Sequence, residues 1–149
     1  MLQTIRTNSN NSEFIKLVSE LDLYLSGING DSNDFFTQHN KIDLINHVII
    51  IYENEIAVGC GAIKHFNENS MEIKRMFVST SHRRKGIARK ILNELTSWAK
   101  ELGYKTCVLE TSDTMTSAVK LYTNSGFFII PNYGPYQEIK SSICFEKSI

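Results

Sequence analysis

The stretch MEIKRMFVSTSHRRKGIARKILNELTSWAKELGYKTCVLET, residues 71–111, decides the fold. It opens with a strand-like run, Met71–Val78, and closes with another, Thr106–Thr111. Between them, apolar residues recur every three or four positions, as on one face of a helix that Gly103 ends. These residues are Ile87, Ile91, Leu92, Leu95, Trp98, Ala99 and Leu102. Two strands joined by a crossover helix must run parallel, so we predict a parallel pair here.

The sequence before this unit predicts antiparallel strands joined by tight turns. Val48–Tyr52 is a buried β run, and Ala57–Phe66 follows it after the turn Glu53-Asn54-Glu55. A second turn, Asn67-Glu68-Asn69, leads into Met71–Val78. Three strands connected by such short turns form an antiparallel meander.

The N-terminal part predicts one strand and one helix. Leu2–Arg6 can form a short opening strand. A helix is expected from about Ser12, a good N-cap residue, through Tyr24, because its apolar residues are spaced by three and four. Those residues are Phe14, Leu17, Val18, Leu21 and Leu25. The polar segment Ser26–Asn40 is expected to be a loop, with room for one short helix around Asn33–His39.

The C-terminal part predicts a shorter helix and the last strands. The helix is expected over Thr116–Ser125 and ends at Gly126, and the strands over Phe127–Ile130 and Ser142–Glu146. The sheet is then mixed, antiparallel first and parallel at the crossover, which predicts an α+β (α/β sandwich) fold. No repeat or Pro/Gly/Ser-rich linker divides the 149 residues, so we expect a single domain over residues 1–149.

Composition restricts the kinds of partner. Sixteen basic and sixteen acidic residues cancel, so no global field draws the chain to nucleic acid or to a membrane. The N-terminus lacks the layout of a secretory signal, and Val48–Tyr52 is far shorter than the ~20 residues that span a bilayer. Cys60, Cys107 and Cys144 lie in strand-like runs without metal-ligand spacing, which favours buried thiols and no metal. We therefore expect a soluble, cytoplasmic protein.

The basic segment His82–Lys90 joins the strand to the start of the longest predicted helix. A helix N-terminus presents unpaired backbone N–H groups and a partial positive charge, which suit a phosphate. Gly86 lets the backbone approach an anion closely, and Ala88 is small. A run of charges is often only solvated surface, but its place between strand and helix favours phosphate binding.

The sequence pattern of this segment restricts the classes of phosphate ligand that it could bind. The Walker pattern and G-x-G-x-x-G are both absent, which disfavours ATP, GTP and Rossmann-bound dinucleotides. Arg83-x-x-Gly86-x-Ala88 follows Val78 by five residues. It resembles R/Q-x-x-G-x-G/A, the acetyl-CoA motif of the GCN5-related N-acetyltransferase (GNAT) family.

The resemblance extends beyond this motif. Met71–Val78 is similar to the family's fourth strand, and Ala118–Phe127 resembles its A-x-x-L-Y-x-x-x-G-F segment. With Val58-Gly59 in the third strand, the match spans about residues 48–130. One short motif is a weak signal, but the two motifs at this distance form a strong one.

The resemblance implies that the fourth and fifth strands splay apart around the pantetheine arm, in a sheet flanked by helices. Backbone groups at the end of the fourth strand would pair with pantetheine and hold the thioester carbonyl: Met76, Phe77 and Val78. Amides of the following turn would wrap the pyrophosphate: Arg84, Lys85, Gly86, Ile87 and Ala88. Arg83 belongs to the same predicted set, and acetyl-CoA is the implied co-substrate, with no metal.

One position departs from the family. Met115 stands where many relatives carry an Asn, three residues before the alanine of A-x-x-L-Y. A polar contact to the coenzyme is therefore missing, or a neighbour such as Thr114 or Ser117 supplies it.

Acetyl transfer to an amine needs two proton movements, one from the ammonium and one to the leaving thiolate. Tyr122, in the Leu-Tyr-x-x-x-Gly-Phe context, is the expected acid because a phenol of pKa ~10 is protonated at neutral pH. Glu72 and Glu110 both resemble positions that serve as bases in the family. Glu72 is slightly favoured, and water acting as a relay stays open. Strand alternation puts residues 72, 74, 76 and 78 on one face, unless a bulge intervenes.

The acceptor is the least defined part of the prediction. The resemblance places it between Asp22–Asn40 and Pro131–Tyr136, where acids could attract an amine and tyrosines could form a wall. The acids are Asp22, Asp31 and Asp34, and the tyrosines are Tyr133 and Tyr136. We predict an N-acetyltransferase for a small or amino-acid-like primary amine, acting by direct attack in a ternary complex. The alternatives are a non-catalytic acyl-CoA-binding module and a protein N-terminal or lysine acetyltransferase, and a homodimer is left open.

Overall fold

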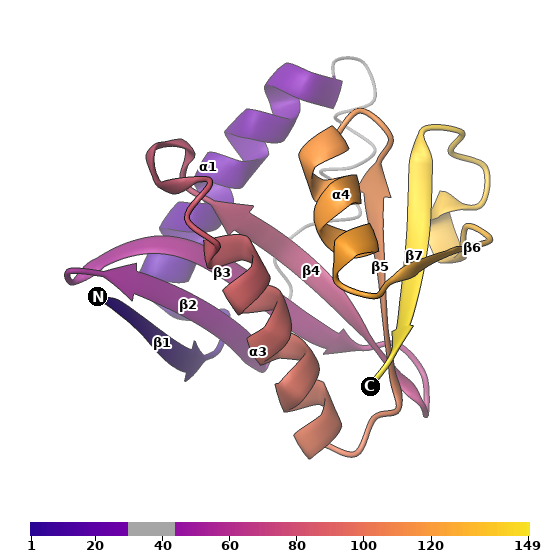
Figure 1. Ribbon diagram of the computed structural model, residues 1–149, viewed down its shortest axis with the longest axis horizontal. Helices are drawn as coiled ribbons and strands as arrows, with labels where there is room; N and C mark the ends of the chain where they lie inside the picture. Colours follow the sequence, from indigo (N-terminus) through magenta and orange to yellow (C-terminus); the bar gives the residue numbers. More distant parts are fainter. Residues whose placement is uncertain (30–43) are drawn as a thin grey trace. The chain divides into compact units, whose positions relative to one another are not determined.

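A computed structural model of the chain describes residues 1–29 and 44–149 (Figure 1). Its elements in order are β1 (Leu2–Thr7), α1 (Ser12–Asn29), β2 (His47–Glu53), β3 (Ile56–His65), β4 (Ser70–Val78), the 3-10 turn η2 (Thr80–His82), α3 (Ile87–Glu101), β5 (Thr106–Ser112), α4 (Thr116–Asn124), β6 (Phe128–Ile130), the 3-10 turn η3 (Gly134–Tyr136) and β7 (Ser142–Ser148). Each predicted strand and helix within these residues is present. The predicted short helix at Asn33–His39 and the acids Asp31 and Asp34 lie outside the described residues.

The strands form one sheet in the order β1-β2-β3-β4-β5-β7-β6. The pairs β1/β2, β2/β3, β5/β7 and β6/β7 are antiparallel, whereas β4 and β5 are parallel. The parallel register runs from Ser70 opposite Thr106 to Glu72 opposite Val108. A mixed sheet with the parallel pair at the α3 crossover confirms the predicted α+β fold.

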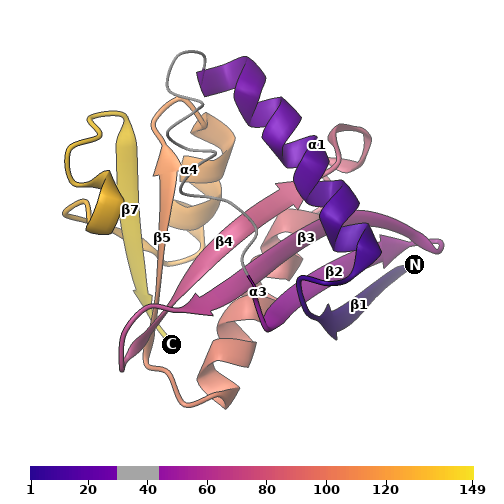
Figure 2. The same ribbon diagram turned by 180° about the vertical axis from the view of Figure 1, so that it is seen from behind.

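The chain comprises two compact units. The first comprises Met1–Lys64 and Ile73–Leu95, and the second comprises His65–Glu72 and Thr96–Ile149. In the first unit, α1 covers one face of β2 and β3, and α3 covers the other (Figures 1 and 2). The α1 face is filled by Phe14, Leu17, Val18, Leu21, Ile45, Val48, Ile50, Cys60, Ala62 and Phe77. This two-sided burial explains why β2 is almost continuously apolar.

The start and end of α1 differ from the prediction. The side-chain oxygen of Asn11 accepts hydrogen bonds from the amides of Glu13 (2.9 Å) and Phe14 (3.2 Å), so Asn11 is the N-cap and Ser12 is the first helical residue. The helix also continues past Tyr24 to Asn29. The helix therefore includes Gly27, although a glycine inside a helix costs about 1 kcal/mol, and Tyr24 and Leu25 before it pack against the core.

Two glycines of β3 let α3 lie close on the sheet. A Cβ atom added to Gly61 would lie 2.7 Å from Cγ2 of Ile91 and 2.8 Å from Cδ1 of Leu95. A Cβ atom on Gly59 would lie 3.1 Å from Cγ2 of Ile87 and 3.2 Å from the carbonyl oxygen of Phe77. The missing side chains therefore bring the first turn of α3 beside the end of β4.

The hairpin between β2 and β3 has the tight turn that the sequence predicts. Glu53 pairs with Ile56, and the two residues between them both have positive φ, 51° at Asn54 and 71° at Glu55. Two left-handed residues in a two-residue loop match the type I′ turn, whose twist suits a hairpin. Glu53 is therefore the last paired residue of β2.

In the second unit, α4 lies beside β5 (Figure 1), and its Tyr122 packs among aromatic rings. The ring of Tyr122 is 5.9 Å from that of Phe127 and 5.8 Å from that of Phe145.

The three cysteine thiols are buried, as the sequence predicts. Burial raises the pKa of Cys107 to about 12, and in the first unit it raises the pKa of Cys60 to about 12.

Candidate active site

The predicted phosphate segment is a turn with two left-handed residues at the head of α3. Arg84 has φ 66° and Gly86 has φ 77°. The carbonyl of Gly86 accepts the amide of Lys90 at 3.1 Å, so Gly86 is the N-cap residue of α3. Left-handed residues in such a turn direct successive amides to one side, which makes a concave site for an anion. A Cβ atom on Gly86 would meet no atom within 4 Å, so the turn faces open space.

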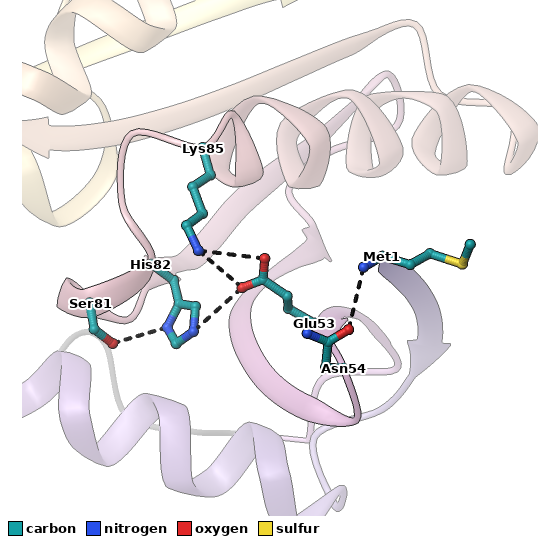
Figure 3. A network of polar contacts seen from close by, with 6 residues as sticks. All are labelled: Met1, Glu53, Asn54, Ser81, His82 and Lys85. Carbon is teal, nitrogen blue, oxygen red and sulfur yellow. Dashed lines mark hydrogen bonds and ion pairs between the residues drawn. The ribbon is translucent and has the colours of Figure 1, made fainter.

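The basic side chains of this turn meet a carboxylate from the β2–β3 hairpin. Nζ of Lys85 lies 3.3 Å from Oε2 of Glu53, and Nε2 of His82 lies 3.5 Å from the same oxygen (Figure 3). Oγ of Ser81 lies 3.0 Å from Nδ1 of His82. Sequence reasoning missed Glu53, because Lys85 is 32 residues away and no local pattern connects the two.

Arg83 contacts protein groups on β4 and α1. Its Nε donates to the carbonyl of Val78 at 3.0 Å. Its guanidinium carbon lies 4.6 Å from the ring centroid of Tyr24 and 5.6 Å from that of Phe77. These contacts tie the turn to the end of β4, so the structure gives the Arg83 side chain an anchoring role.

The end of β4 is buried and irregular. Arg75 has φ 59°, a left-handed conformation inside a strand. Phe77 and Val78 are both buried, although they are consecutive. Residues 72, 74 and 76 are half-buried between buried neighbours, as the predicted alternation requires, but Val78 departs from it, beyond the left-handed residue Arg75. Met76 lies on the α3 face, since its Sδ would be 2.8 Å from a Cβ on Gly61.

Asp22, one of the acids considered for amine binding, pairs with a buried arginine. Nη1 of Arg75 donates to Oδ1 of Asp22 at 3.1 Å, and the side chains are 3% and 41% exposed, respectively. A buried guanidinium needs a compensating anion. This carboxylate therefore already serves the stability of the first unit.

Tyr122, the predicted acid, is buried in the second unit with 6% of its surface exposed. Burial raises the pKa of its phenol, and the nearby charge of Glu110 raises it further. The phenol is therefore protonated at neutral pH, as an acid must be before it donates.

Both candidate bases accept a hydrogen bond from a hydroxyl of the second unit. Oη of Tyr133 donates to Oε2 of Glu72 at 2.8 Å, and Oγ of Ser142 donates to Oε2 of Glu110 at 2.7 Å. Burial raises the pKa of Cys144, and the charges of Glu110 and Glu72 raise it further, so both carboxylates act on one thiol. The structure therefore brings Glu72 and Glu110 into one neighbourhood.

Aromatic rings surround the Tyr133 side chain. Its ring centroid is 4.8 Å from that of Phe66 and 5.8 Å from that of Tyr136, both edge-on. Burial and the adjacent Glu72 raise the pKa of the Tyr133 phenol, which keeps its hydrogen for the carboxylate. Tyr133 is partly exposed but Tyr136 is buried, so only Tyr133 of the two expected tyrosines has ring surface free for an acceptor, and Phe66 is a neighbouring ring that sequence reasoning missed.

The positions around the missing asparagine are exposed. Ser117 lies in the first turn of α4, and Thr114 lies just before it. Oγ1 of Thr114 lies 2.9 Å from Oγ of Ser112.

In the described ranges, 1–29 and 44–149, no group of three or more His, Cys, Asp or Glu side chains is placed to hold a metal ion. No helix in that part of the chain is long and apolar enough to cross a membrane.

Comparison with known proteins identifies the family. A model of the acetyltransferase (GNAT) family matches residues 14–127. The chain belongs to the GNAT family. The family that the motifs of the sequence predict is thus confirmed, and with it an acyl-CoA-dependent acyltransferase activity.

Two curated relatives support this assignment. An uncharacterized N-acetyltransferase of Bacillus subtilis is 34% identical over 100 residues, which are 66% of this chain and 66% of the relative. An IAA acetyltransferase of Azospirillum brasilense is 29% identical over 137 residues, which are 91% of this chain and 90% of the relative.

Solved GNAT structures have the same fold. A provisionally assigned acyl-CoA N-acyltransferase of Klebsiella pneumoniae superposes with a TM-score of 0.82 at 27% identity, over 99% of this chain and 97% of that one. A GNAT acetyltransferase of Elizabethkingia anophelis, solved with acetyl-CoA bound, has a TM-score of 0.74 at 16% identity. The superposition covers 99% of this chain and 98% of that one. The GNAT fold of this chain is therefore established along almost its whole length.

Proposed function

We propose that this GNAT protein transfers the acetyl group of acetyl-CoA to the primary amine of a small or amino-acid-like acceptor. The observation that carries the proposal is the open left-handed turn at Arg84–Gly86, at the head of α3. In it, the amides of residues 84–88 hold the pyrophosphate, with help from the helix dipole. Backbone groups of Met76–Val78 pair with the pantetheine arm.

The reaction is a direct attack in a ternary complex. The ammonium first loses a proton to the base, and the free amine nitrogen bonds to the thioester carbonyl carbon. As the C–S bond breaks, the departing sulfur receives the phenolic proton of Tyr122, and the phenolate takes the second proton from the acetylated nitrogen. The sequence context of Tyr122 supports this role, and its raised pKa means that the phenol carries its proton before the reaction.

We propose that Glu72 is the base and that Glu110 affects the pKa of the acid, Tyr122. Burial and the charge of Glu110 raise the pKa of Tyr122, so the phenol keeps its proton until the negative charge of the departing sulfur draws it away. Glu72 is held by the Tyr133 hydroxyl in a fixed orientation. A relay through water is the alternative, and it predicts that Glu72→Gln lowers turnover no more than Glu110→Gln.

The acceptor class follows from the groups around Glu72. Phe66 and Tyr133 supply ring surface beside that carboxylate, and the buried Tyr136 packs against Tyr133; such a surface suits a cationic amine attached to an apolar or aromatic body. The zero net charge of the chain favours a small acceptor over a basic histone or ribosomal protein. A protein N-terminus or a lysine side chain is the alternative acceptor.

Coenzyme binding is tested by thermal unfolding in the presence of acetyl-CoA, CoA and ATP. Acetyl-CoA and CoA should raise the unfolding temperature and ATP should not, because only a ligand that binds the native state stabilises it. Release of free thiol over a panel of small amines, amino acids and peptides then identifies the acceptor. Thermal stabilisation without turnover on any amine would favour the non-catalytic module.

The acid is tested with Tyr122→Phe. Turnover should fall by roughly 10²–10⁴-fold, the usual contribution of a proton donor, while the Kd for acetyl-CoA is unchanged. Tyr104→Phe is the matched control, because the Tyr104 hydroxyl, 2.7 Å from Nδ1 of His65, has no proposed role. Full turnover in Tyr122→Phe would refute the assignment.

A further inference from the structure

The β2–β3 hairpin places a carboxylate against the coenzyme turn. Oε2 of Glu53 is 3.3 Å from Nζ of Lys85 and 3.5 Å from Nε2 of His82, and Oε1 is 3.5 Å from Nζ (Figure 3). Both basic groups belong to the segment that we assign to the coenzyme's phosphates. One carboxylate thus contacts two basic groups of that segment.

Glu53 is held there by the backbone of the hairpin. It is the last paired residue of β2, opposite Ile56, and the tight turn of Asn54 and Glu55 follows it at once. The adjacent Asn54 accepts from the α-amino group of Met1 at 3.4 Å (Figure 3). A carboxylate at the end of a closed hairpin has little freedom to move away, so its contact with the turn is built into the fold.

We propose that Glu53 is a resident anion of the coenzyme turn, which the phosphates of the coenzyme replace. In the free protein its carboxylate pairs with the ammonium group of Lys85 and contacts the imidazole of His82. When the coenzyme binds, Lys85 exchanges the carboxylate for a phosphate oxygen. The inference rests on the proposed coenzyme site and adds a residue that sets the affinity of that site.

The contacts are suited to exchange. The Lys85 side chain is 49% exposed and that of Glu53 is 23% exposed, and ion pairs at such positions are weak. Lys85 has a long, flexible side chain and can turn toward a ligand without movement of the backbone. Glu53 therefore competes with the phosphates for a cation, which weakens coenzyme binding and speeds its release.

The test compares two glutamates of the same turn. Glu53→Gln removes the charge but keeps the size, and Glu55→Gln makes the same change at an exposed residue with no contact to Lys85 or His82 in the residues described. In calorimetric titration at low salt, Glu53→Gln should bind CoA about three- to tenfold more tightly than the natural protein, as expected for release of one or two weak ion pairs. Glu55→Gln should bind as the natural protein does, and the gain in Glu53→Gln should shrink as salt is added.

Two further titrations show where the gain arises. Pantetheine lacks phosphates, so its affinity should be the same in Glu53→Gln and in the natural protein. In a Lys85→Met background, Glu53→Gln should gain much less affinity for CoA, because the competed cation is absent. The unfolding temperature of each variant shows that it is folded.

The outcomes separate this inference from the proposed function. If Glu53→Gln binds CoA no more tightly than Glu55→Gln, or gains equally with pantetheine, the resident-anion role is refuted while the coenzyme site stands. If the natural protein does not bind CoA, both proposals fall together.

Discussion

Gly86 and Gly103 flank the two ends of α3 and allow the coenzyme site to be tested with a matched pair. Both have positive φ, 77° and 95°, and a Cβ atom on either would meet no atom within 4 Å. Replacing either glycine with alanine therefore adds backbone strain of about 1–2 kcal/mol and no steric overlap with the protein. For a chain of this size, each kcal/mol lowers the unfolding temperature by roughly 2–4 °C, so both variants should lose about 2–8 °C.

Coenzyme affinity should distinguish the two variants. The new methyl group of Gly86→Ala projects into the space that we assign to the pyrophosphate and separates the phosphate from the amides of the turn. Loss of one hydrogen bond to a charged group costs about 1.5–3 kcal/mol, which corresponds to a roughly 10- to 150-fold weaker Kd. Gly103→Ala, at the far end of the helix, should bind CoA as the natural protein does.

Calorimetric titration with CoA and acetyl-CoA measures both effects on the same samples. A Gly86→Ala protein that binds CoA as tightly as Gly103→Ala would show that the turn at the head of α3 does not hold the pyrophosphate. A large loss of stability in Gly86→Ala, with Gly103→Ala unaffected, would show instead that the space beside Gly86 is occupied by protein.

Two further predictions concern stability. In urea unfolding, Gly61→Ala should destabilise the protein by about 1–3 kcal/mol, because its Cβ would overlap Ile91 and Leu95. Gly59→Ala should lose less stability, because the contacts of its Cβ would be longer. If Gly61→Ala were at least as stable as Gly59→Ala, this account of the packing would be wrong. Stability should also fall as pH rises above 9, because burial raises the pKa of Cys60 from 9.0 to about 12 and only the unfolded chain ionises this thiol in that window. The stabilisation is complete below pH 9 and is lost toward pH 12. Between about pH 8 and pH 10.5, the urea midpoint of Cys60→Ala should therefore fall less steeply with pH than that of the natural protein. Equal slopes in the two proteins would refute this contribution.

Local patterns predicted the elements well, because each depends on residues close in sequence. The spacing of Ile87, Ile91 and Leu95 is enough to define α3, and the acid-rich turn after Tyr52 is enough to define a hairpin. The errors were also local. Ser12 and Asn11 are both good N-caps, and only the hydrogen bonds to Glu13 and Phe14 decide between them.

The site was predicted less completely, because its contacts join distant residues. The hydrogen bond from Tyr133 to Glu72 spans 61 residues, and no periodicity in either segment predicts it. The same holds for Glu53 and Lys85. For Arg83, the motif indicated a basic side chain beside a phosphate, but its aromatic partner Tyr24 depends on how α1 packs on the sheet. Such contacts follow from the packing of elements, which the pattern of one strand or helix does not describe.

The two glycines of β3 also restrict how this chain can evolve. With no side chain at positions 59 and 61, the space there is filled by Ile91 and Leu95 of α3 and by Met76 of β4. A larger residue at position 61 costs least after a smaller one has appeared at position 76, 91 or 95, so the order of substitutions matters. Because the same helix presents its first turn to the proposed phosphates, drift in this part of the core is coupled to retention of the coenzyme.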